Sequence, residues 1–74
     1  MLSILENEGF TVARETVEGN NVATRLENGH GDVIILEREY FPPDEIENNI
    51  YVITGELDIE LEMKLEDLDC EVIY

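Results

Sequence analysis

The chain contains very few basic residues. Four Lys and Arg stand against 19 Asp and Glu in 74 residues, which gives a formal net charge of −15 at pH 7. A surface this acidic is repelled by nucleic-acid phosphates and by anionic lipid headgroups. Nucleic acid and membranes are therefore excluded as direct ligands, and we expect any partner to present a basic protein surface. Self-repulsion on this scale also opposes the compact state, so the acids need an explanation.

Cysteine and long apolar runs are scarce as well. Cys70 is the only cysteine, so no internal disulfide can form, which is typical of proteins in a reducing compartment. No stretch approaches the roughly 18 apolar residues that a membrane span needs. Residues 1–6 lack the basic region and the apolar run of a signal peptide. These absences predict a cytoplasmic protein.

Groups suited to catalysis or metal binding are few and scattered. Ser3 is the only serine and His30 the only histidine, which leaves no evident nucleophile–base pair and no zinc ligand set. Cys70 belongs to an apolar stripe, which is typical of core packing. The acidic segments lack the glycine and distal glutamate of a calcium loop. We therefore expect no enzymatic activity, no catalytic residue, no bound metal and no cofactor.

The apolar pattern predicts one domain over residues 1–74, of the α+β class but mainly β, with an antiparallel sheet of five or six strands. Residues 3–8 predict a short N-terminal helix with Ser3 as its N-cap and Gly9 as its stop. Three strands are then predicted over residues 10–18, 22–27 and 32–40. They are separated by Gly19-Asn20-Asn21 and by Asn28-Gly29, which are turn sequences.

The third of these runs contains Val33-Ile34-Ile35-Leu36, which predicts a central strand buried on both faces. Pro42 and Pro43 must end that strand, because proline lacks the backbone donor that a strand ladder needs. Residues 44–48 suggest a single helical turn capped by Asp44. Residues 50–54 suggest a further strand that ends at a bend near Gly55.

The segment from residue 56 to residue 74 allows two interpretations. Apolar and charged residues alternate without a miss over residues 57–65, and the alternation shifts phase after Glu66-Asp67, which predicts a β-hairpin. The alternative is a helix, because Leu57, Leu61 and Leu65 share one helical stripe with Leu68 and Val72. The segment is also rich in helix formers. The strand interpretation is preferred, because a helix would place Ile59, Met63 and Cys70 on its far side.

Acidic residues are concentrated in this segment, which holds eight of the 19 acids beside one lysine between residues 56 and 71. On a strand they would repeat every 6.7 Å or so and form a rigid ladder. Such a ladder can occupy a groove built for a phosphate backbone, which also presents regularly spaced charge of one sign. The candidate partner-binding residues are Glu56, Asp58, Glu60, Glu62, Asp67, Asp69 and Glu71, with Glu37 and Glu39 near the end of the third strand as an extension.

The run Glu56-Leu57-Asp58-Ile59-Glu60-Leu61-Glu62 and the set Asp67, Asp69 and Glu71 resemble the acidic DNA-mimic inhibitors of bacteriophages and mobile elements, including anti-CRISPR and anti-restriction proteins. The resemblance is one of composition and size, since these inhibitors share no common motif. It implies a protein that blocks the DNA- or RNA-binding groove of a bacterial defence complex, in the cytoplasm of the host cell if the chain is phage-encoded.

Two other interpretations of the acidity remain open. The chain can be a cellular interaction module, such as an antitoxin or an accessory subunit, that docks through an apolar surface and an open sheet edge. The acids can also be a solvated surface adapted to concentrated salt, with no partner at all. The uneven distribution of the acids along the chain favours a binding role over salt adaptation.

Overall fold

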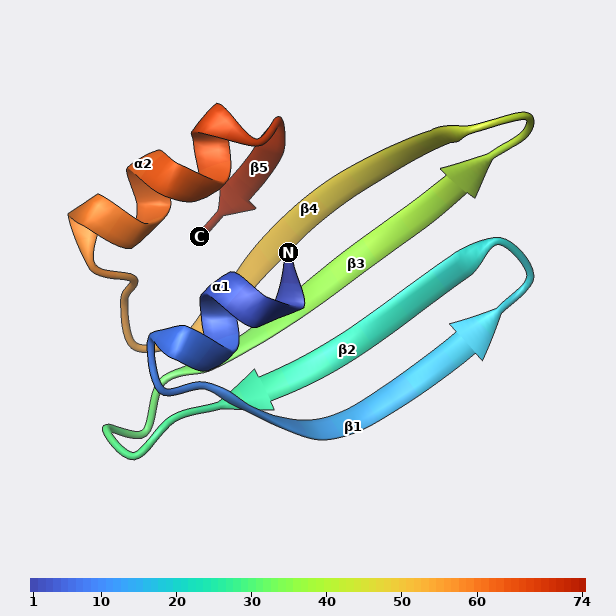
Figure 1. Ribbon diagram of the computed structural model, residues 1–74. Helices are drawn as coiled ribbons and strands as arrows, with labels where there is room; N and C mark the ends of the chain where they lie inside the picture. The colour runs from blue at the N-terminus through green and yellow to red at the C-terminus, as the bar shows by residue number, and fades with distance from the viewer.

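The structure, a computed structural model, describes residues 1–74 and is α+β with mainly β structure, as the sequence predicts. The elements in chain order are α1 (Leu2–Asn7), β1 (Thr11–Glu18), β2 (Asn21–Glu27), β3 (Val33–Phe41), β4 (Glu45–Thr54), α2 (Ile59–Asp67) and β5 (Cys70–Ile73). The five strands form one sheet in the order β1-β2-β3-β4-β5. Both helices cover the same face of this sheet (Figure 1).

Strands β1 to β4 form an antiparallel meander, and the predicted short helix and first three strands are confirmed. The N-cap of α1 is Met1, so the prediction that Ser3 caps this helix is wrong. Gly19 adopts a φ of 59° in the turn between β1 and β2, a conformation that costs glycine little. In the next turn the Asn28 side-chain oxygen accepts hydrogen bonds from the backbone N–H groups of His30 (3.0 Å) and Asp32 (2.9 Å). Asparagine is favoured in turns because it can bond its own backbone in this way.

The proline pair ends β3 at Phe41, as predicted, but the helical turn predicted over residues 44–48 is wrong. Strand β4 already begins at Glu45, and it pairs with β3 from Phe41↔Glu45 onwards. A ladder with β3 satisfies the backbone groups of alternate residues in this segment, and pairing with β5 begins at Asn48. A single isolated turn of helix leaves most of its backbone groups without partners, so the strand is the more stable choice.

The strand predicted over residues 57–65 is also wrong, and the helical alternative is correct. Leu57, Leu61 and Leu65 recur every four residues and are buried on one side. Ile59 and Met63 lie on the outer side of α2, where they are 71% and 61% exposed. On this helix the alternating pattern therefore places every second apolar residue toward the core and leaves the others in solvent. The helix still forms, because the segment is rich in residues with high helix propensity.

Strand β5 confirms the strand expected after Asp67, but the predicted hairpin is absent because β5 runs parallel to β4. Parallel neighbours need a crossover connection, and α2 supplies it. The sheet is therefore mixed, with an antiparallel part from β1 to β4 and one parallel edge strand. Asp69, with a φ of 58°, makes the tight reversal between α2 and β5, a conformation that short polar side chains adopt more readily than others.

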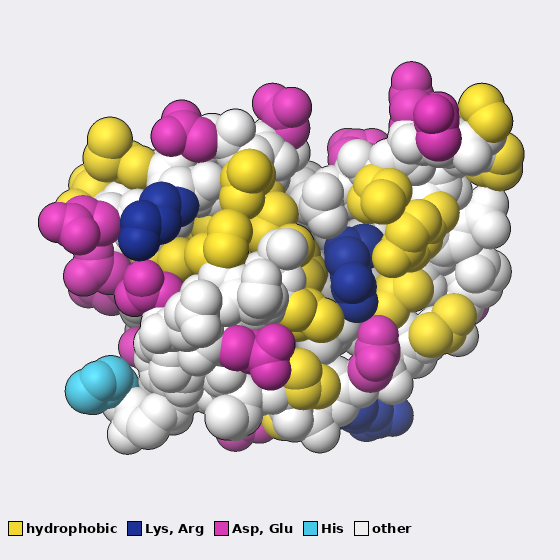
Figure 2. Space-filling view, in the orientation of Figure 1, with side chains coloured by type: hydrophobic (Ala, Val, Ile, Leu, Met, Phe, Trp, Pro, Cys, Tyr) yellow, Lys and Arg dark blue, Asp and Glu magenta, His cyan; other side chains and the backbone are white.

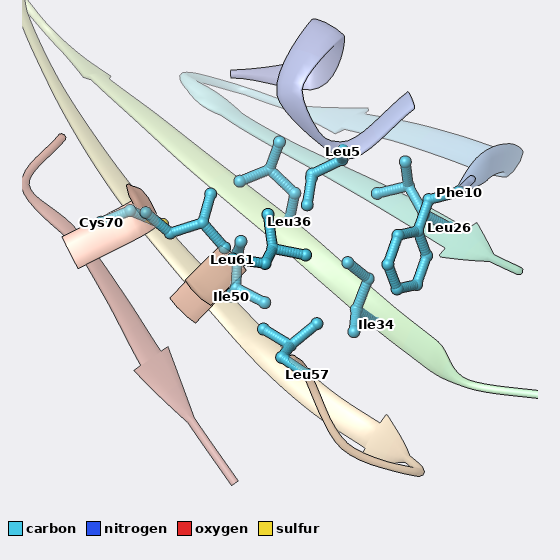
Figure 3. Packing of buried hydrophobic residues seen from close by; sticks show 10 residues of the cluster. Leu5, Phe10, Leu26, Ile34, Leu36, Ile50, Leu57, Leu61 and Cys70 are labelled. Atoms are coloured by element: carbon cyan, nitrogen blue, oxygen red, sulfur yellow. The ribbon is translucent and has the colours of Figure 1, made fainter. Parts of the chain in front are cut away.

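The core lies between the two helices and one face of the sheet (Figure 3). Ile34 and Leu36 of β3 are fully buried there, whereas Val33 and Ile35, which point to the other face, are only partly buried. The prediction that β3 is central is confirmed by the strand order. The prediction that β3 is buried on both faces is wrong, because no second layer covers the far side of the sheet.

Candidate binding surface

The face of the sheet opposite the helices is termed the open face. Successive side chains of a strand point to opposite faces, so residues that pair across the strands form rows on one face. At the end of the sheet with the β1–β2 and β3–β4 turns, one row holds Glu18, Asn21, Glu39 and Glu47, and the adjacent row holds Thr16, Ala23, Glu37, Asn49 and Glu71. Glu45 lies next along the same face, paired with Phe41. The acidic patch is defined as Glu18, Glu37, Glu39, Glu45, Glu47 and Glu71.

The six carboxylates of the acidic patch make no hydrogen bond and no ion pair within the molecule. No lysine or arginine shares their rows. Glu39 and Glu47 are direct cross-strand partners, and like charges at such positions destabilise a sheet. The patch therefore has a cost in stability that nothing inside the molecule offsets, which is a common feature of functional sites.

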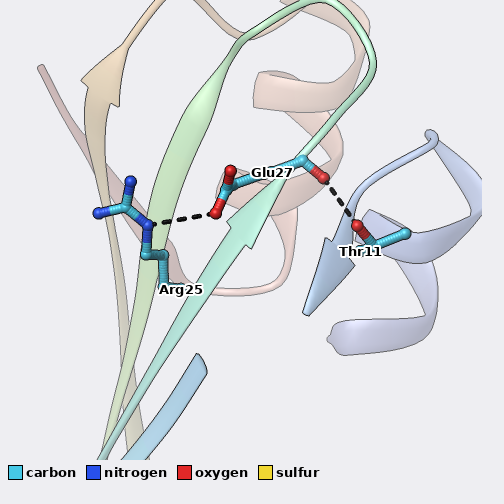
Figure 4. Close-up of polar contacts among 3 residues, drawn as sticks. All are labelled: Thr11, Arg25 and Glu27. Carbon is cyan, nitrogen blue, oxygen red and sulfur yellow. Dashed lines mark hydrogen bonds and ion pairs between the residues drawn. The ribbon is translucent and has the colours of Figure 1, made fainter. Parts of the chain in front are cut away.

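The other half of the open face has the opposite character. Arg14 and Arg25 face one another across β1 and β2, and Ile35, Tyr51 and Ile73 continue the same row. Figure 4 shows how the adjoining residues are joined: the Arg25 Nε lies 3.4 Å from a Glu27 carboxylate oxygen, and the Thr11 hydroxyl donates to the Glu27 carbonyl at 3.2 Å. The Glu27 carboxylate is paired with Arg25, so the unpaired negative charge of the open face is confined to the other end.

The nine acids predicted as partner-binding residues fall into three groups. Glu37, Glu39 and Glu71 lie together in the acidic patch. Four others lie around the beginning of α2, namely Glu56, Asp58, Glu60 and Glu62. The remaining two lie at its end: Asp67 is the last residue of α2, and Asp69 is in the turn that follows. The predicted ladder over residues 56–62 does not form, because these residues belong to a loop and a helix whose side chains point in several directions.

The acids at the beginning of α2 have local structural roles. Asp58 is the N-cap, and its carboxylate accepts a hydrogen bond from the Glu60 backbone N–H at 2.8 Å. Glu60 and Glu62 lie in the first turn, where negative charge is stabilised by the helix dipole. The Tyr74 hydroxyl donates to Glu62 at 2.9 Å, and this hydrogen bond raises the pKa of Tyr74 above its usual value. Asp58, Glu60 and Glu62 are therefore explained by the helix they begin.

A pocket of about 220 Å³ lies where the end of α1, the β2–β3 turn and the loop before α2 meet. Its apolar residues are Phe10, Leu57 and Leu61, and its polar ones are Glu8, Asn28, His30, Asp32, Glu56 and Asp58. Several of these polar groups are already engaged: Glu8 pairs with Lys64 at 3.7 Å, and Asp32 accepts from the Asn28 amide at 2.9 Å. No group of three or more His, Cys, Asp or Glu in the structure could hold a metal ion.

Cys70 is 2% exposed and belongs to the core. Burial raises the pKa of its thiol from 9.0 to about 11. The reactive form of cysteine is the thiolate, so this thiol is protonated and unreactive at neutral pH. The interpretation of Cys70 as a core residue is confirmed.

Three members of the acidic patch were not singled out from the sequence: Glu18, Glu45 and Glu47. Glu18 directly precedes the turn at Gly19, which would have placed it at the end of a hairpin. Glu45 and Glu47 flank Ile46 in strict alternation, but that signal is lost once the segment is interpreted as a helical turn. Correct pairing across the proline turn would have placed Glu47 beside Glu39.

Comparisons with known protein families, with curated proteins and with solved structures find no match to this chain. Neither helix is of a length and hydropathy that could cross a membrane.

Proposed function

We propose that this protein is a binding protein without catalytic activity that engages a basic, nucleic-acid-binding surface of another protein through its acidic patch. The observation that carries the proposal is that six glutamates share one end of the open face and none of them is paired within the molecule. Lysine and arginine side chains of a partner would supply the missing counter-charges.

The geometry of the patch supports a mimic of nucleic-acid phosphates. Strands lie about 4.8 Å apart and alternate residues of a strand about 6.7 Å apart, so the carboxylates form a regular two-dimensional array. Backbone pairing on both sides holds β3 in place, and β4 is paired with β3 along the patch and with β5 from Asn48 onwards. A rigid array binds with little loss of conformational entropy. An inhibitor that excludes DNA or RNA from a basic groove, like the anti-CRISPR and anti-restriction proteins, is the form of this function that we favour.

Two variants with equal charge test the proposal. The first is Glu37→Gln, Glu39→Gln and Glu47→Gln in the acidic patch, and the second is Glu56→Gln, Glu60→Gln and Glu62→Gln beside α2. Each removes three negative charges and nearly preserves side-chain shape. The wild type and both variants serve as baits for proteins in a bacterial lysate, and captured proteins are identified by mass spectrometry.

We expect a nucleic-acid-binding protein that the wild type and the α2 variant retain and that the patch variant loses. Duplex DNA or RNA should compete with the bait for that protein. Equal capture by all three baits would contradict a role for the patch. Loss of capture with both variants alike would assign binding to net charge alone, which is the result expected for a merely acidic surface.

A second candidate function is docking through apolar surface, and a specific feature favours it. The helices cover only part of their face of the sheet, and beyond them apolar side chains remain exposed around a basic one (Figure 2). The strand register places Val17, Val22 and Arg38 in one row of this face and Tyr40 and Ile46 in the next. Val17 is 67% exposed, Ile46 53% and Tyr40 38%. A cellular interaction module such as an antitoxin would use this surface. Its complex should survive 1 M NaCl, whereas a complex made by the acidic patch should weaken steeply with salt.

A further inference from the structure

Strand β1 is an edge strand whose outer side is free. It pairs only with β2, and all eight of its residues are exposed. An irregularity between Val12 and Arg14 interrupts its register, so the regular free edge runs from Arg14 to Glu18. Such an edge presents unpaired backbone N–H and C=O groups, which can pair with a strand from another chain.

Arg14 is the second unusual feature of this edge. The other three basic side chains each form an ion pair: Arg25 with Glu27, Arg38 with Glu15, and Lys64 with Glu8. Arg14 forms none, although the chain has 19 acids, and its cross-strand partner is another arginine. A carboxylate from another chain placed beside β1 would give Arg14 an ion pair and offset its repulsion from Arg25.

We propose that two copies of this chain pair through β1 in antiparallel orientation, with a two-fold axis at Thr16, to form one continuous sheet. This register follows from the backbone. A two-residue turn makes its flanking residues, Glu18 and Asn21, a hydrogen-bonded pair, so the backbone groups of Glu15 and Val17 point away from β2. A second copy can use these free groups only in registers that pair residue 15 or 17 of one copy with residue 15 or 17 of the other.

Charge selects one register among these. Pairing each Glu15 with its own copy would oppose two like charges, which is destabilising. Pairing each Val17 with its own copy would leave Arg14 without a carboxylate opposite. Pairing Glu15 with Val17 of the second copy places Arg14 opposite Glu18 of the second copy, and symmetry repeats this ion pair. Thr16 then faces its own copy across the axis, where non-hydrogen-bonded partners approach to about 4.5 Å between Cα atoms.

The pairing competes with the mutual repulsion of two chains that each carry −15. The dimer is therefore weak at low ionic strength and is tested in 0.5 M NaCl, where the screening length lies between about 3 and 8 Å. Binding of a basic partner by the acidic patch is weakened at that salt concentration, so the dimer can succeed or fail independently of the proposed function.

Disulfide trapping tests the register. Thr16→Cys should form a disulfide-linked dimer under mild oxidation, because the two sulfurs meet at the axis. Thr11→Cys is the matched control, since the same change on the same strand lies beyond the register irregularity and outside the shared ladder. Native Cys70 is buried and does not compete. Equal cross-linking of the two variants, or none with Thr16→Cys, would overturn the proposal.

Charge reversal tests the ion pairs by sedimentation equilibrium. Arg14→Glu and Glu18→Arg should each lower the association constant by on the order of tenfold, since two ion pairs become two like-charge contacts. The double variant Arg14→Glu with Glu18→Arg recreates the pairs in reverse and should restore association. Circular dichroism confirms that each variant is folded. A monomer at millimolar concentration, or single variants that associate like the wild type, would also overturn the proposal.

Discussion

The two faces of the sheet differ although the same strands build both. On the covered face, Ile34, Leu36 and Ile50 are fully buried under the helices. On the open face, their sequence neighbours Glu37 and Asn49 are only partly buried. Burial of apolar area stabilises the first face by roughly 25 cal/mol per Å², while repulsion between glutamates destabilises the second. The covered face therefore determines the fold, and the open face is available for function.

Adjacent residues of β3 give the largest contrast between the faces. Leu36→Ala leaves a cavity in the core and should lower the free energy of unfolding by about 2–5 kcal/mol. Glu37→Ala, one residue along and on the other face, should change it by no more than about 0.5 kcal/mol. Urea denaturation followed by circular dichroism measures both. Similar losses for the two variants would mean that the open face is also part of the core.

The buried thiol of the covered face should make stability depend on pH. The pKa of Cys70 is raised from 9.0 to about 11 in the folded state. Below pH 9 the thiol is protonated in both states, so it has no effect on pH dependence. Between pH 9 and 11 only the unfolded state loses the proton, so stability should fall with rising pH, by up to roughly 3 kcal/mol.

Denaturation of the wild type and of Cys70→Ala at pH 8, 9, 10 and 11 isolates this contribution. The alanine variant still contains the tyrosines and the other groups that titrate in this range, so the difference between the two curves belongs to the thiol. Parallel curves for the two proteins would contradict a desolvated thiol at this position.

The acids of α2 should behave as structural residues. Asp58→Ala removes the N-cap and should cost about 1 kcal/mol, while Asp58→Asn retains a side-chain acceptor and should cost much less. Both substitutions remove one charge, so net charge cannot explain a difference between them. Thermal unfolding at constant ionic strength provides the comparison. Equal losses would show that the charge of Asp58 matters and its hydrogen bond does not.

Substitution of acids on the open face should have the smallest effect on stability, and this effect should be a gain where the other substitutions cause a loss. Changing Glu39 and Glu47 together to glutamine removes a cross-strand pair of like charges. The free energy of unfolding should rise by roughly 0.2–1 kcal/mol, and the gain should shrink in 1 M NaCl as the repulsion is screened. A loss of stability would instead indicate that these side chains support the fold.

The fold could be predicted from the sequence wherever one signal was local and strong. The turns at Gly19 and Asn28 and the prolines after Phe41 located three of the five strands. Residues 57–65 could not be assigned in this way, because alternating apolar residues fit a strand and also fit a helix with two apolar sides. Burial of Leu57, Leu61 and Leu65 under one sheet decides between them, and that is a tertiary effect.

The candidate site was predictable only in part for the same reason. Glu37, Glu39 and Glu71 were identified as acids on strands, but the sequence does not show that β5 runs parallel to β4 and brings Glu71 into a row with Glu37. The acids of residues 56–62 were overweighted because their regular spacing suggested a ladder. Their spacing instead reflects an N-cap and the first turn of a helix.

Mapping of a basic probe onto the molecule tests whether binding capacity resides on the open face. The ¹⁵N-labelled protein is titrated with a decalysine peptide, and amide shifts are followed by NMR at low salt and again in 1 M NaCl. The largest shifts should fall on the rows that contain Glu37, Glu39 and Glu47, with smaller shifts near α2, and they should disappear in 1 M NaCl. Shifts centred on the beginning of α2, or spread evenly over the surface, would contradict the assignment of binding to the acidic patch.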